Sequence, residues 1–166
     1  MGTVAEVNEK NLRIYLQDHL AGSTTGLELA RRIRGENEGN EYGDAIAAVA
    51  DDIDADRRAL QALMEDFGFG PDKLKNIGAW TVEKAGRLKL NGQITGYSPL
   101  SRMEELEGLL TGITGKQALW TALLQIAPDE PRLDAARLEH LRERAAAQRE
   151  TVEGLREKAA REAFLA

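Results

Sequence analysis

The chain has 166 residues, a formal net charge of -6 at pH 7 and no cysteine. This length suffices for one domain with its own hydrophobic core, and we expect residues 1–166 to form it. The lack of cysteine excludes disulfides and thiolate metal sites, and the acidic balance argues against a nucleic-acid partner. No apolar run suits a signal peptide or a membrane span, so we expect a cytoplasmic protein that is not attached to a membrane.

Apolar residues recur at spacings of three and four along most of the chain, which predicts an all-α protein. Thr3 and Glu6 have the spacing of a capping box, and the first predicted helix runs from there to Gly35. The second predicted helix begins near Asn40 and ends at Gly68, a residue that suits a left-handed helix cap. Because the loop between these helices is short, they should form an antiparallel hairpin.

The second half of the chain begins with a long connection. Pro71 suits the first turn of a shorter helix, which the pattern ends near Asn91 and Gly92. Ser101 then has the capping-box spacing that opens the third long helix, and the fourth runs from about Pro131 to near the C-terminus. Such a crossover predicts a four-helix bundle in which the second and third long helices run parallel.

Two glycines, Gly112 and Gly115, interrupt the third long helix within one turn. Glycine in the interior of a helix costs about 1 kcal/mol relative to alanine. We therefore expect a kink at this point, or close packing of a neighbouring backbone against it.

Three inward-facing positions carry polar residues where apolar ones are expected: His19, Asp56 and Gln148. His19 and Asp56 are about equally far from the expected turn, so an antiparallel hairpin places them at the same height. A buried carboxylate needs a partner, and imidazole provides an N–H donor or a positive charge. We therefore predict a buried polar layer in which His19 pairs with Asp56, and Gln148 and Glu107 complete it.

The preferred interpretation of this layer is structural, because buried polar pairs often fix the register of packed helices without doing chemistry. The protein would then be a non-catalytic interaction or scaffold protein that needs no cofactor. Helical bundles often associate with a second copy, so a homodimer is also expected.

Residues 71–102 form a basic segment, with six basic against two acidic side chains. A basic helix face can bind an anionic partner such as RNA, a membrane surface or an acidic protein. It can also be a solvated face whose lysines pair with the acidic helices, and we prefer this interpretation. The residues of the anion-binding alternative are Lys73, Lys75, Lys84, Arg87 and Lys89.

The chain resembles the ferritin-like superfamily, including its uncharacterised bacterial members. The resemblance lies in the four long helices, the long crossover and the polar residues at mid-height. Metal-binding members carry inward-facing glutamates and two Glu-x-x-His motifs. This chain contains no Glu-x-x-His; residues 52–55 read Asp-Ile-Asp-Ala and residues 148–151 read Gln-Arg-Glu-Thr. The resemblance implies a ferritin-like bundle and, as a further alternative, a degenerate metal-binding or redox protein with iron or manganese. Its metal ligands would be His19, Asp52, Asp56 and Glu107.

Overall fold

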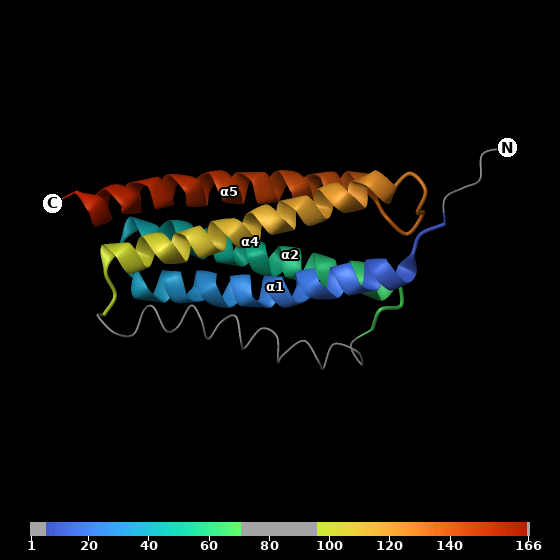
Figure 1. Cartoon of the computed structure of the whole chain (residues 1–166), viewed down its shortest axis with the longest axis horizontal. Coiled ribbons are helices and arrows are strands. Elements are labelled where there is room, and N and C mark those ends of the chain that lie inside the picture. Colours follow the sequence, from blue (N-terminus) through green and yellow to red (C-terminus); the bar gives the residue numbers. More distant parts are fainter. Residues whose placement is uncertain (1–5, 71–95, 166) are drawn as a thin grey trace.

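The computed structural model describes residues 6–70 and 96–165. These residues form four long helices and no strand, namely α1 (Glu9–Glu36), α2 (Glu41–Asp66), α4 (Pro99–Ile126) and α5 (Ala135–Phe164) (Figure 1). The prediction of an all-α four-helix bundle is therefore confirmed for these residues. None of these four helices has the length and apolar character needed to cross a membrane. The expected crossover helix and its basic residues lie outside the described residues: Lys73, Lys75, Lys84, Arg87 and Lys89.

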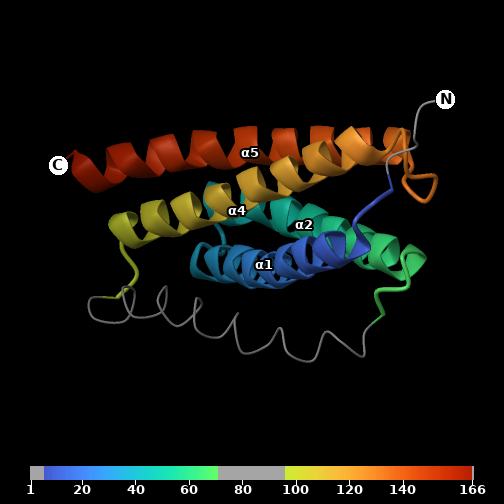
Figure 2. The same ribbon diagram turned by 45° about the vertical axis from the view of Figure 1, so that its right-hand side comes forward.

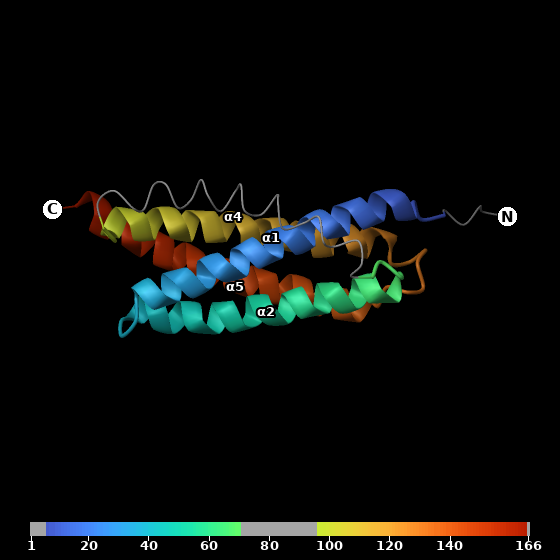
Figure 3. The same cartoon turned by 90° about the horizontal axis from the view of Figure 1, so that it is seen from below.

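The four helices are arranged as two antiparallel hairpins, α1 with α2 and α4 with α5. Figure 2 shows the hairpins stacked on one another as two layers. α2 ends at one end of the bundle and α4 begins at the opposite end, so these two helices run in the same direction (Figures 1 and 3). Across the layers, α1 packs against α4 and α2 against α5, each pair antiparallel.

Side-chain caps determine where the four described helices begin. α2 starts after Asn40, whose Oδ1 accepts from the backbone N–H groups of Tyr42 and Gly43 at 2.9 and 3.2 Å. α1 starts after Asn8, whose Oδ1 accepts a hydrogen bond from the backbone N–H of Asn11 at 3.1 Å. Thr3 of the predicted capping box lies outside the described residues. α4 starts after Ser98, whose Oγ accepts from the N–H of Ser101 at 3.2 Å. α5 starts after Asp134, later than predicted. In each case the cap satisfies an N–H that the first turn leaves free.

The predicted left-handed cap at Gly68 is confirmed, with a backbone φ of 69°. The N–H of Gly68 donates to the carbonyl of Glu65 at 2.8 Å, and the N–H of Phe69 donates to that of Met64 at 2.9 Å. These bonds satisfy carbonyl groups of the last turn of α2, which would otherwise have no partner. Glycine is suited to this position because it has no Cβ to oppose a positive φ.

The hydrophobic core divides into two parts along the bundle axis. The first part includes Leu16, Leu20, Leu60, Met64, Leu119, Trp120, Leu138, Leu141 and Ala145. The second part includes Leu27, Ala30, Ile33, Ile46, Ile53, Leu106, Ile113, Val152 and Ala159. On each helix about two turns separate the parts. The candidate site lies at this intermediate level.

Gly43 lies in the first turn of α2, where a Cβ atom would overlap the backbone carbonyl of Asn37. We expect Gly43→Ala to lower the free energy of unfolding by about 1–3 kcal/mol, because the turn between α1 and α2 must shift. Gly154→Ala on α5 is the control: no described atom lies within 4 Å of that Cβ, so this change should raise stability by up to about 1 kcal/mol. Urea unfolding measures both changes in the free energy of unfolding. If the two variants change it in the same direction, the steric role assigned to Gly43 is wrong.

Candidate functional site

A buried carboxylate, that of Asp56 on α2, occupies the level between the two parts of the core and is 1% exposed. Its Oδ2 accepts hydrogen bonds from Nζ of Lys116 on α4 at 2.6 Å and from Nε2 of Gln148 on α5 at 2.9 Å. Its Oδ1 accepts from Arg144 on α5, with Nε at 2.7 Å and Nη2 as a second donor. The Lys116 ammonium also donates to Oε1 of Gln148. One carboxylate thus connects three helices.

Two cations and one carboxylate meet in this polar layer, which we define as Asp56, Lys116, Arg144 and Gln148. Burial lowers the pKa of the Lys116 ammonium, and the neighbouring Asp56 carboxylate opposes that shift. The Arg144 side chain is 25% exposed, so water solvates part of its charge. Both oxygens of Asp56 are engaged with donors, as a carboxylate removed from water requires.

His19 does not pair with Asp56, which corrects the sequence-based prediction. Its half-buried imidazole packs edge-on against the ring of Tyr15, with centroids 4.6 Å apart and planes at 73°. Burial lowers the pKa of His19, and the carboxylate of Asp18 opposes that shift. His19 and Asp56 line the same cavity, but long cationic side chains from α4 and α5 occupy the acceptor sites of the carboxylate.

The structure does not bring the other predicted ligands together. Glu107 lies on the outside of α4 with its side chain 51% exposed, 3.4 Å from Nη1 of Arg156, so it is not part of the polar layer. Asp52 is partly exposed, one turn before Asp56. Within residues 6–70 and 96–165, no three histidine, aspartate or glutamate side chains converge to hold a metal ion. The set His19, Asp52, Asp56 and Glu107 is therefore not assembled as a metal centre.

Sequence reasoning missed two members of the layer, Lys116 and Arg144. A signal existed for Lys116, because it follows Ile113 by three residues and precedes Trp120 by four, which places it on the inward face of α4. Arg144 precedes Gln148 by four residues and so lies on the same face of α5. Charged residues are normally expected on the solvated face of a helix, and for this reason the sequence pattern did not predict Lys116 and Arg144 inside the layer.

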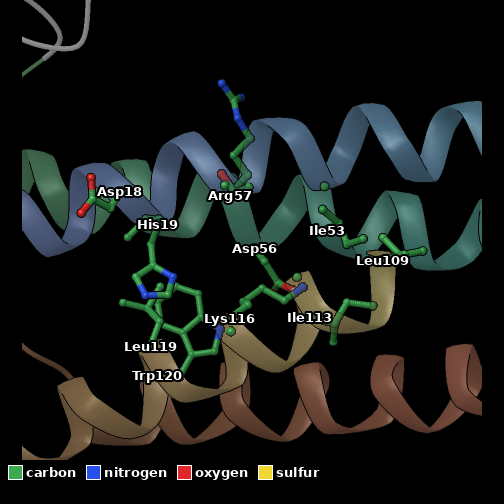
Figure 4. Close-up of a pocket in the computed structure, with 16 residues that line it drawn as sticks. Asp18, His19, Ile53, Asp56, Arg57, Leu109, Ile113, Lys116, Leu119 and Trp120 are labelled. Carbon is green, nitrogen blue, oxygen red and sulfur yellow. The ribbon is translucent and has the colours of Figure 1, made fainter. Parts of the chain in front are cut away.

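A cavity of about 260 Å³ adjoins the polar layer on its α1 side (Figure 4). Its walls come from α1, α2 and α4. The polar side chains that line it include His19, Asp56 and Lys116. Asp18, Ser23 and Arg57 also line it, and its aliphatic lining comes from Ile53, Leu60, Leu109, Ile113 and Leu119.

Four glycines also line the cavity: Gly22 and Gly26 on α1, and Gly112 and Gly115 on α4. Among the described residues, no atom lies within 4 Å of a Cβ built at any of the four. Within the described residues, the close backbone contact that was one of the two expectations for Gly112 and Gly115 is not found, and α4 continues as one helix through both. The kink, the other expectation, stays a prediction. These glycines leave space beside the polar layer.

Comparisons with models of protein families, with curated proteins and with solved structures find no match to this chain. The function is therefore inferred from the geometry of the polar layer and the cavity. The sites expected from the sequence and those formed by the structure differ mainly in the partners of Asp56.

A double-mutant cycle tests the partners of Asp56. We expect Asp56→Leu to lower the free energy of unfolding by about 3–5 kcal/mol, because it leaves the Lys116 and Arg144 cations without their carboxylate. Lys116→Leu should cost less, because Arg144 stays paired with Asp56. The double variant should lose at least about 1 kcal/mol less than the sum of the two. Asp56→Leu combined with His19→Leu is the matched control and should be close to additive. Urea unfolding measures these free energies. If the losses add for Asp56→Leu with Lys116→Leu but not for Asp56→Leu with His19→Leu, Lys116 is not the partner of Asp56.

The burial of His19 predicts a pH dependence of stability. The folded state holds the pKa of His19 below its ordinary value of 6.5, so near that pH the unfolded chain binds more protons. This part of the stability is present above pH 6.5 and is lost as the pH falls through 6.5 toward the folded pKa. His19→Asn should flatten urea midpoints measured between about pH 5 and pH 8, whereas His140→Asn on the exposed face of α5 should not. If the urea midpoint of His19→Asn depends on pH as steeply as that of the wild type, His19 is not the source of this pH dependence.

Proposed function

We propose that this protein is a non-catalytic binding protein that holds a small apolar molecule in the cavity between α1, α2 and α4. The observation that carries the proposal is that four helical glycines line this cavity with open space at each Cβ position. Four glycines in helix interiors cost about 4 kcal/mol relative to alanine. In the described part of the structure, close helix packing does not offset that cost at these positions.

The size and composition of the cavity suit a small organic molecule. An apolar cavity of about 150 Å³ in a helical protein binds benzene. The present cavity, at about 260 Å³, has room for a larger ring system or a medium-length alkyl chain. Small-molecule sites are typically preformed clefts with mostly apolar walls and a few polar groups, which is the composition found here.

The polar layer supports binding because it holds one wall of the cavity in place. Asp56 and Lys116 line the cavity, and Arg144 and Gln148 fix them from the side of α5. The polar atoms of these four side chains are engaged with one another, which favours a supporting role over proton transfer. A rigid wall also reduces the entropy that is lost when a ligand binds.

We further propose that the bundle is ferritin-like, as the parallel directions of α2 and α4 and the two antiparallel hairpins suggest. The scaffold role and the homodimer stay predictions. The anion-binding alternative also stays a prediction, because its residues lie outside the described ranges.

Filling the cavity tests the proposed function. We expect the neutral fluorophore phenylnaphthylamine to bind the wild-type chain with increased emission. Gly26→Leu and Gly115→Leu should each weaken this binding about tenfold, which corresponds to the loss of roughly two methylenes of apolar contact. Gly154→Leu, on α5 and away from the cavity, is the matched control and should bind like the wild type.

Stability measured on the same samples separates loss of the cavity from loss of the fold. Leucine is a good helix former, and described atoms leave space at positions 26 and 115, so both variants should unfold at or above the wild-type urea midpoint. The proposal fails if the wild type does not bind the fluorophore, or if the control variant loses affinity as the two cavity variants do.

A further inference from the structure

The imidazole of His19 stands in the wall of the cavity, next to the space that the glycines leave open. Gly22 follows His19 by three residues, so the ring and the space at Gly22 share one face of α1. Figure 4 shows the ring directed from α1 toward Leu119 and Trp120 of α4. Gly115 precedes Leu119 by four residues, which places its open side near the ring on the facing helix. A molecule that fills this space therefore lies against the imidazole.

The imidazole is only partly withdrawn from solvent. His19 is of intermediate exposure, and the ring of Tyr15 covers one side of it, with the two centroids 4.6 Å apart. This burial already lowers the pKa of His19 below its ordinary value of 6.5. An apolar ligand against the ring displaces more of its water, which costs a charged imidazolium far more than a neutral imidazole. The ligand and the proton on His19 therefore oppose one another.

The charged groups that face His19 leave this opposition in place. On α1, the Asp18 carboxylate favours the protonated ring, but burial is the larger effect. On α2, Asp56 and Arg57 line the cavity, and the Asp56 carboxylate is already engaged by cations. On α4, Lys116 adds a positive charge to that of Arg57, and neither favours a further one. Among the described residues, α5 contributes none to the lining.

We propose that the cavity releases its apolar ligand on mild acidification, because protonation of His19 places a charge in the wall against which the ligand lies. The inference rests on the proposed function, because it describes the regulation of the same cavity. The ligand binds the neutral form of His19 better. Its affinity is therefore full above the pKa of His19 in the free protein, which lies below 6.5, and falls as the pH drops through that pKa.

Phenylnaphthylamine binding at two pH values tests this release. Because each unit by which the ligand lowers the pKa of His19 is worth up to about tenfold in affinity, we expect the wild-type chain to lose at least about threefold between about pH 7.5 and pH 5. His19→Asn removes the protonation site and should lose less than about 1.5-fold over the same range. His140→Asn, on the exposed face of α5, is the matched control and should lose as much affinity as the wild type.

Proton NMR measures the same linkage from the side of the histidine. The chain has two histidines, so His140→Asn leaves the ring resonances of His19 as the only ones of their kind. Saturating phenylnaphthylamine should lower the pKa of His19 by at least about half a unit, the shift that corresponds to a threefold change in affinity. This measurement needs no substitution at position 19, so it decides the matter even if His19→Asn does not fold.

The outcomes separate the regulation from the binding function. If phenylnaphthylamine binds equally at both pH values, if it leaves the pKa of His19 unchanged, or if His19→Asn loses affinity as the wild type does, the regulation is overturned while the binding function stands. If the fluorophore does not bind at about pH 7.5, the proposed function fails and the inference fails with it. Far-ultraviolet circular dichroism of the same samples should be equal at the two pH values. A loss of helix at the lower pH would also overturn the proposal, because the ligand would then leave an unfolded chain.

Discussion

The internal arrangement of this bundle depends on the accommodation of one buried carboxylate. A charge removed from water is tolerated only when donors and opposite charges surround it. For Asp56 on α2, these come from Lys116 on α4 and from Arg144 and Gln148 on α5. The layer therefore connects one hairpin to both helices of the other and sets their relative register. It also interrupts the hydrophobic core, which continues on either side of it.

α1 behaves differently from the other three described helices at this level. It contributes no hydrogen bond to Asp56, and its residues there are small: Gly22, Ser23 and Gly26. The hydroxyl of Ser23 donates to the carbonyl of Leu20 in its own helix at 2.6 Å. The cavity thus lies where the fourth side of the polar layer would be.

Two costs to stability coincide in this one place, a buried charged layer and four helical glycines. A bundle selected for stability alone would have apolar residues in the layer and alanine in place of the glycines. Local departures of this kind are expected at functional sites, where stability is exchanged for a shaped space. Small-molecule binding accounts for these features together, whereas a purely structural role accounts for the charged layer alone.

The sequence by itself determined the four helices, their hairpin pairing and the inward position of Asp56 and Gln148. These follow from a periodicity of 3.6 residues and from loop lengths, both of which are local properties. Only the tertiary structure decided that Lys116 and Arg144, and not His19, reach the carboxylate. Periodicity reports the face on which a residue lies, whereas long cationic side chains contact groups well beyond their own position. The glycines also could not be interpreted from the sequence. Their spacing along a helix is compatible with close packing of a neighbouring helix and with open space, and only the positions of the neighbouring helices distinguish these two cases.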